Sequence, residues 1–139
     1  MEKEPGRVCL DTDVVIDYLK GTEETEDLIE KLHLRFDEVV LTAITVYELF
    51  VGVEYLDGKD REETEAIVKS SSILPFDETA SRVAAKISAE LRKSGQQIGF
   101  PDELIAAICQ VSNASLLTNS VEHFRRIRNL RVIGFDQLT

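Results

Sequence analysis

Short apolar runs alternate along the chain with longer stretches in which apolar residues recur at helical spacing. Apolar runs of this kind are typical of buried strands, and they occur at residues 8–10, 39–41, 73–76, 115–118 and 131–135. Amphipathic spacing, capping residues and first-turn acids predict helices between them, at residues 14–19, 22–36, 43–56, 61–70, 78–93, 102–112 and 121–127. Gly21 and Gly58 are the expected stops of two of these helices.

This alternation predicts an α/β fold in which helices cover both faces of a central, mostly parallel sheet of about five strands. The 139 residues contain no internal repeat and no linker-like segment, so residues 1–139 are expected to form a single domain. Ligands bind beyond the carboxyl ends of the strands in such sheets. Asp11 follows the first predicted strand, and Thr118, Asn119 and Ser120 lie at the end of the fourth.

Three acidic residues stand in settings where a charge is costly. Asp11 closes the apolar run 8–10, Glu48 is the only charged residue in the apolar stretch 43–53, and Asp102 opens an apolar helix. Buried carboxylates are stable only when they are paired or bind a cation, and hard divalent ions prefer oxygen ligands. The trio therefore predicts a site for Mg²⁺ or Mn²⁺ and a metal-dependent enzyme.

Each acid also has a simpler interpretation. Asp11 could cap the helix that follows it, although Asp13 fits that role as well or better. Glu48 could reach water at the edge of its helix or pair with an arginine. Asp102 follows Pro101 and could stabilise the first turn of its helix, as Glu103 could too. Only the combination of all three points to one kind of chemistry.

The net charge of −10 argues against a nucleic-acid partner, because affinity for nucleic acids rests largely on Lys and Arg meeting phosphates. The charge is unevenly distributed, however. Acidic residues gather at 23–27 and 57–65, whereas basic residues gather at 82–93 and 125–131, on either side of Asp102 in the sequence. A basic rim around an acidic centre is therefore compatible with the composition.

The cysteines and histidines of the sequence do not form a recognisable metal-binding or redox motif. Cys9 and Cys109 lie in apolar runs without metal-binding spacing, which predicts buried, reduced thiols and a cytoplasmic protein. His33 and His123 have no partner at a recognisable spacing, so neither is assigned to a metal. No stretch is apolar over the roughly 20 residues that a membrane helix requires, and no targeting segment is expected.

Four segments in order resemble the motifs of the PIN-domain ribonucleases of the VapC toxin type, and the resemblance extends from Val8 to Phe135. The segment from Leu10 to Gly21 resembles the first motif and places Asp11 at its metal-binding aspartate. Residues 45–49, followed by Gly52, place Glu48 at the conserved glutamate of the second motif. Residues 98–107 place Asp102 at the central aspartate of the third, and residues 116–120 with Phe124 resemble the fourth.

The resemblance implies a three-layer α/β/α sandwich and a Mg²⁺- or Mn²⁺-dependent endoribonuclease, in which a metal-activated water hydrolyses RNA phosphodiester bonds. It further implies a homodimer and a cognate antitoxin protein that holds the toxin inactive. Asp11, Glu48 and Asp102 are the expected metal ligands, and Thr118 and Ser120 are expected to orient the site. Ser120 departs from the family, which often has Asp or Asn there, so a second metal ion has a weaker site, and Glu122 is a poorly placed substitute.

Two alternatives stay open at this point. The sequence Asp11-Thr12-Asp13 superficially resembles the nucleophile motif of haloacid-dehalogenase-type phosphatases, in which Asp11 would form an aspartyl phosphate. The second alternative is a catalytically degenerate PIN-fold protein with a binding or regulatory role. It is motivated by Ser120 and by the acidic surface.

Overall fold

The computed structural model describes residues 4–55 and 60–138, which contain one five-stranded sheet. Every strand pair is parallel, and the strand order is β3-β2-β1-β4-β5. The strands are β1 (Glu4–Leu10), β2 (Phe36–Thr42), β3 (Ser72–Leu74), β4 (Ala114–Leu117) and β5 (Val132–Ile133). The predicted parallel sheet of about five strands is confirmed.

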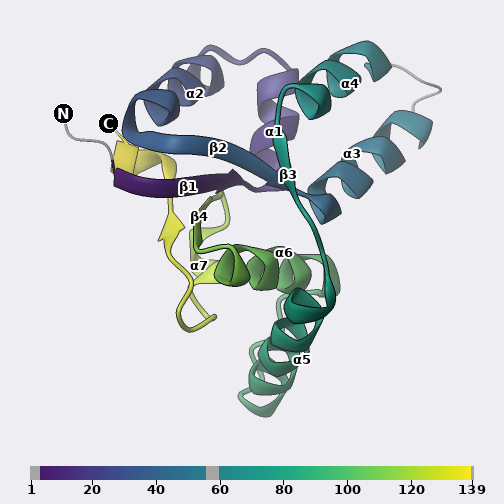
Figure 1. Ribbon diagram of the computed structural model, residues 1–139, viewed down its shortest axis with the longest axis vertical. Coiled ribbons are helices and arrows are strands. Elements are labelled where there is room, and N and C mark those ends of the chain that lie inside the picture. The colour runs from purple at the N-terminus through teal and green to yellow at the C-terminus, as the bar shows by residue number, and fades with distance from the viewer. Residues whose placement is uncertain (1–3, 56–59, 139) are drawn as a thin grey trace.

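Helices connect the strands and cover the sheet (Figure 1). They are α1 (Thr12–Leu19), α2 (Glu23–Arg35), α3 (Ala43–Tyr55), α4 (Arg61–Lys69), α5 (Glu78–Lys93), α6 (Phe100–Val111) and α7 (Val121–Phe124), followed by a 3₁₀ helix at Phe135–Leu138. The predicted helix end at Leu56 and Gly58 lies outside the described residues. Within the described residues, no helix is both long and apolar enough to cross a membrane.

The three-layer arrangement follows from the alternation of side chains along the strands. Val8 and Leu10 of β1 pack into the core that contains α1 and α2, whereas Cys9 packs into the core that contains α5 and α6. All three side chains are at most 3% exposed. The sheet is therefore buried on both faces, as the sequence predicted, with α1 and α2 on one side and α5 and α6 on the other (Figure 1).

The strand order places the topological switch point of the sheet between β1 and β4. The chain proceeds from β1 outward through β2 to β3, and then crosses to the other side of β1 to form β4 and β5. Ligands bind at such switch points in open parallel sheets, just outside the carboxyl ends of the strands. Asp11 and Thr118 are the first residues beyond those ends of β1 and β4.

Candidate functional site

Asp11 links the end of β1 to the start of α1. Its backbone N–H continues the sheet by donating to the carbonyl of Leu117 at 2.9 Å, and its Oδ1 accepts from the backbone N–H of Thr12 at 2.9 Å. Asp11 is thus the N-cap of α1, and the capping role expected for Asp13 is wrong. Its other oxygen, Oδ2, accepts a 2.7 Å hydrogen bond from the hydroxyl of Thr118. The side chain is held from both strands.

The environment of Asp11 disfavours its charged form. Burial raises the pKa of this carboxyl from 3.8 to about 6, and the negative charges of Asp102 and Asp13 act in the same direction. The hydrogen bonds from Thr118 and Thr12 lower the pKa and offset only part of that effect. Asp11 is 4% exposed, so water cannot stabilise the carboxylate to the usual extent. A cation beside it would relieve this penalty.

Glu48 reaches the same region from α3 and is held by Thr12. The Thr12 hydroxyl donates to Glu48 Oε1 at 2.7 Å and lies 2.9 Å from the hydroxyl of Thr45. A hydroxyl has a single proton, so Thr45 must donate to Thr12. The Thr42 hydroxyl lies 3.4 Å from that of Thr45 and donates to it. A relay of buried hydroxyls from the end of β2 therefore orients the half-buried Glu48 carboxylate.

Asp102 enters from the first turn of α6 and is bonded to His123. The imidazole Nε2 lies 2.9 Å from Asp102 Oδ2, and both side chains are about one-third exposed. Burial raises the pKa of Asp102, while the hydrogen bond and charge of His123 lower it. The His123 ring itself packs edge-on against Phe124, with ring centroids 5.5 Å apart. His123 thereby fixes the orientation of the Asp102 carboxylate.

Gly99 gives this carboxylate its position. It precedes α6 with φ of 102°, a left-handed conformation that glycine adopts without strain. Pro101 lies in the first turn, where a missing N–H costs nothing. The helix therefore begins at Phe100, two residues earlier than the sequence pattern predicted.

Ser120 follows Thr118 at the end of β4. Its backbone N–H donates to the Thr118 hydroxyl oxygen at 2.9 Å, which leaves the Thr118 proton directed at Asp11. Ser120 is also the N-cap of α7, but its side chain makes no capping hydrogen bond. Its half-buried hydroxyl is therefore available to a bound group.

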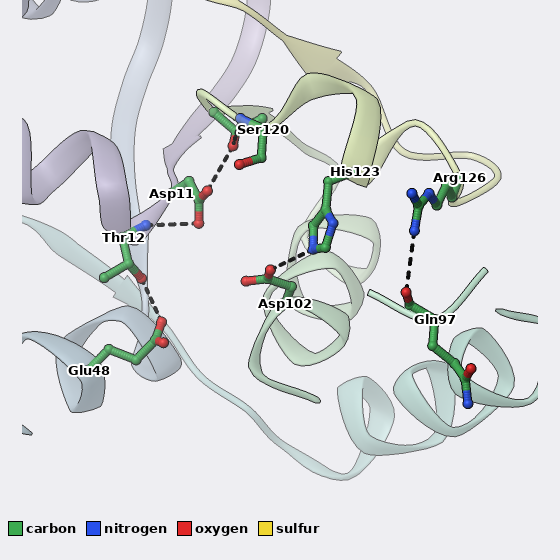
Figure 2. A network of polar contacts seen from close by, with 9 residues as sticks. Asp11, Thr12, Glu48, Gln97, Asp102, Ser120, His123 and Arg126 are labelled. Atoms are coloured by element: carbon green, nitrogen blue, oxygen red, sulfur yellow. Dashed lines mark hydrogen bonds and ion pairs between the residues drawn. The ribbon is translucent and has the colours of Figure 1, made fainter. Parts of the chain in front are cut away.

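The carboxylates of Asp11, Glu48 and Asp102 are turned toward a shared space (Figure 2). Asp11 and Asp102 are close enough for the charge of Asp102 to raise the pKa of Asp11. Glu48 is joined to Asp11 only through Thr12. Within residues 4–55 and 60–138, no group of three or more His, Cys, Asp and Glu side chains is compact enough to hold a metal ion by itself. The three-residue metal site stays a prediction.

The donor set nevertheless fits a hard divalent cation. Mg²⁺ is usually bound through one or two carboxylates and keeps several waters. Asp11 and Asp102 supply two carboxylates whose charges repel each other and whose pKa values are both raised. A shared cation would remove that repulsion. Glu48 and Ser120 stand where they could contact the waters of such an ion.

Several residues of this site were not found from the sequence. Thr45 was assigned no role of its own. Thr42 was expected only to cap the helix that follows it, which its hydrogen bond from the Thr45 backbone N–H at 3.1 Å confirms. His123 was set aside because it has no partner at a recognisable spacing. Asp13 was interpreted as a cap, yet its charge raises the pKa of both Asp11 and Asp102. The one usable signal was the position of His123 immediately before Phe124, within the segment that resembles the fourth motif.

Comparisons with known proteins agree with this geometry. Residues 8–130 match the PIN domain family model. The chain is 27% identical over 127 residues to the tRNA(fMet)-specific endonuclease VapC of Shigella flexneri, covering 90% of this chain and 95% of that protein. It is 27% identical over 122 residues to Ribonuclease VapC19 of Mycobacterium tuberculosis, covering 88% and 95% respectively.

A solved structure has the same fold. The crystal structure of VapBC2 from Rickettsia felis bound to a DNA fragment from its promoter contains a chain that superposes with a TM-score of 0.83. The sequence identity is 25%, and the match covers 92% of this chain and 98% of that one.

Proposed function

The chain belongs to the PIN-domain family, and we propose that it is a Mg²⁺- or Mn²⁺-dependent endoribonuclease that acts as the toxin of a toxin–antitoxin pair. The observation that supports the metal dependence is the charge interaction by which Asp102 raises the pKa of the buried Asp11. Asp11 lies at the switch point of the sheet, Asp102 approaches it from α6, and both carboxyls have a raised pKa. The VapC relatives, named as ribonucleases, support the choice of RNA.

Each residue has a distinct part in this proposal. Asp11 and Asp102 would hold the cation, with Thr118 and His123 fixing their orientations. Glu48, oriented by Thr12, and Ser120 would position the waters around it. When bound, such a cation lowers the pKa of a coordinated water and offsets the negative charge that builds on the phosphate. Membership of the PIN family leaves the phosphatase alternative without support.

Cleavage of RNA tests this proposal directly. Labelled RNAs, including a tRNA(fMet) transcript because of the specificity named for the Shigella relative, are incubated with the protein in Mn²⁺ or in EDTA. We expect endonucleolytic fragments only with wild type and with Asp27→Asn, an exposed control on α2. Asp102→Asn is expected to be inactive. Cleavage that persists in EDTA or in Asp102→Asn would contradict the proposal, and no cleavage of any RNA with any divalent metal would favour the degenerate-domain alternative.

A cognate antitoxin is the proposed protein partner. The Rickettsia structure contains a VapBC pair on promoter DNA, which supports a partner of that class. A groove of about 420 Å³ between α1, α3 and α4 is lined by Ile16, Leu19, Leu49 and Val53 and includes Glu48. A partner segment seated there would lie against the site. Co-expression with the product of the adjacent gene should yield a stable, inactive complex, and failure to co-purify would oppose this partner.

A homodimer is proposed on the exposed face of α3. Tyr47 is 68% exposed and Tyr55 is 85% exposed, and they line an apolar groove of about 650 Å³ together with Phe50 and Val51. The sequence pattern suggested exposed apolar residues at Ile44, Val51 and Tyr55, but Ile44 is half-buried and packs against the α5–α6 core. Exposed apolar surface of this kind marks association sites.

Light scattering tests the dimer. Wild type should have a mass of twice 15.6 kDa, and Tyr47→Glu should shift it toward the monomer. Leu34→Glu, at an exposed apolar position on α2, is the matched control. A monomer mass for wild type at high micromolar concentration would rule the dimer out. The cytoplasmic location likewise stays a proposal, supported by two free, buried cysteines.

A further inference from the structure

Two basic segments that are far apart in the sequence meet beside the site. The end of α5 and the chain that follows α7 form a groove of about 380 Å³, which we call the α5 basic groove. It is lined by Glu90, Leu91, Lys93, Ser94, Gln96, Arg126 and Arg128. Three cations and one carboxylate give it a formal charge of about +2 in a chain whose net charge is −10.

Buried anchors hold both walls of this groove in place. Leu91 is 3% exposed and places the exposed Lys93 at the end of α5. On the other wall, Ile127 is 6% exposed and leaves its neighbours Arg126 and Arg128 at the surface. The side chain of Gln110, on α6, also donates to the backbone carbonyl of Arg128. The cations are thus presented by fixed backbone.

The cations of the groove are not neutralised by neighbours. Among the residues that the structure describes, Lys93, Arg126 and Arg128 form no ion pair. By contrast, Arg82 pairs with Glu78 elsewhere on α5, and Arg125 pairs with Glu122. The positive potential of the groove is therefore available to an anionic ligand.

Both walls of the groove lead along the chain to the proposed active site. Arg126 Nη1 donates to the carbonyl of Gln97 at 3.3 Å. His123 lies three residues before Arg126, and it forms a hydrogen bond with Asp102, which lies five residues after Gln97. Figure 2 displays these two contacts on the same side of the site. The segment from Gln97 to Asp102 also carries Phe100, which is 71% exposed.

We propose that the α5 basic groove binds backbone phosphates of single-stranded RNA and leads the strand to Asp102. This inference rests on the proposed ribonuclease function. The acidic centre repels RNA, so affinity has to come from cations nearby, and the planar guanidinium groups of Arg126 and Arg128 match phosphate oxygens. The side-chain amide of Gln96 adds a neutral donor, whereas the Ser94 hydroxyl already donates to the backbone carbonyls at the end of α5. Exposed Phe100 offers a stacking surface to an unpaired base, a contact worth about 1–3 kcal/mol per base in single-strand binders.

Fluorescence anisotropy tests the groove without requiring cleavage. A labelled 12-nucleotide oligouridine is titrated with protein in EDTA at several salt concentrations. Arg126→Gln and Arg128→Gln should each lower the salt slope of binding by about 0.7, the value for one lost single-strand phosphate contact. The double variant should bind at least about tenfold more weakly at low salt. Arg82→Gln, on α5, changes the net charge by the same amount as each single groove variant and should bind like wild type.

The outcomes separate this inference from the ribonuclease proposal. Wild type that cleaves RNA in Mn²⁺, with groove variants that bind like Arg82→Gln, would overturn the groove and leave the ribonuclease intact; such a result would favour an acidic protein segment as the ligand. No binding of oligouridine by wild type at low salt would also overturn it. Groove-dependent binding without cleavage would support the groove and contradict the ribonuclease. A hairpin duplex should bind more weakly than oligouridine, and Phe100→Ala should reduce that difference; equal binding of the two RNAs would overturn the single-strand assignment.

Discussion

The Thr118 hydroxyl donates a 2.7 Å hydrogen bond to the Asp11 carboxylate, which joins the ends of β1 and β4 across 107 residues of sequence. The same hydroxyl accepts from the backbone N–H of Ser120, so its proton is committed to Asp11. This hydrogen bond lowers the pKa of the Asp11 carboxyl, whereas burial raises that pKa. Together with the hydrogen bond from the Thr12 backbone N–H, it offsets part of the cost of burying a charged Asp11.

Replacing Thr118 by valine should destabilise the protein by about 1–3 kcal/mol at neutral pH, because the buried Asp11 carboxylate and the partly buried Ser120 N–H each lose a partner. Thr118→Ser keeps the hydroxyl and should restore most of the loss. Urea unfolding in EDTA measures both. Equal stability of the valine and serine variants would mean that the hydroxyl makes no difference to the buried carboxylate.

Asp11→Asn should stabilise the metal-free protein above about pH 6. The folded-state pKa of about 6 lies above the unfolded value of 3.8, so the folded state binds more protons between them. The contribution of this carboxyl to stability is therefore fully present below pH 3.8 and is lost as the pH rises through about 6. A shift of about two units corresponds to roughly 3 kcal/mol at most.

The comparison is made by urea unfolding in EDTA at pH 5 and pH 8. The gain of Asp11→Asn over wild type should be larger at pH 8 than at pH 5. Asp27→Asn, which removes one exposed charge from α2, controls for the effect of net charge. An Asp11→Asn protein that is less stable than wild type at pH 8 would contradict the raised pKa.

His123→Ala should weaken divalent-cation binding by about 10- to 100-fold, the usual cost of removing a residue that orients a metal ligand. Asp102 would keep its charge but lose the 2.9 Å contact that fixes its carboxylate. His33→Ala, at an exposed position on α2, changes the only other histidine and should have no effect. Mn²⁺ titration by calorimetry measures the affinities. Wild-type affinity in His123→Ala would remove the positioning role of this residue.

The sequence predicted the architecture well where local signals were strong. The helix at Glu78–Lys93 has both of its predicted ends, because Asp77 caps its start and an apolar stripe runs along one face. Strands β1 and β2 were predicted too short, because only their apolar segments are visible in a sequence, whereas the last strand was predicted at residues 131–135 and spans only Val132–Ile133. Strand β1 extends back to Glu4 because backbone pairing continues past the apolar run, where Arg7 pairs with Glu38.

The site was predictable in its acids but not in their supports. Charged residues in apolar surroundings identified Asp11, Glu48 and Asp102. Two supporting contacts depend on how separate segments pack: that between Asp102 and His123, and that between Thr12 and Thr45 across 33 residues. Neither produces a periodic pattern in the sequence. The assignment of the cap to Asp13 failed for a related reason, because both residues have the right side chain and only the backbone conformation decides between them. The sequence suggested a basic rim around the acidic centre, but it did not show that the two basic segments form one groove.

The central claim is that Asp11 and Asp102 share one divalent cation, and calorimetric titration of Mn²⁺ into the metal-free protein tests it most directly. We predict saturable binding to wild type and to the Asp27→Asn control. Asp11→Asn and Asp102→Asn should each bind at least about tenfold more weakly, because each loses one of the two carboxylates proposed to hold the cation. Equal Mn²⁺ affinity in wild type, Asp11→Asn and Asp102→Asn would contradict the account.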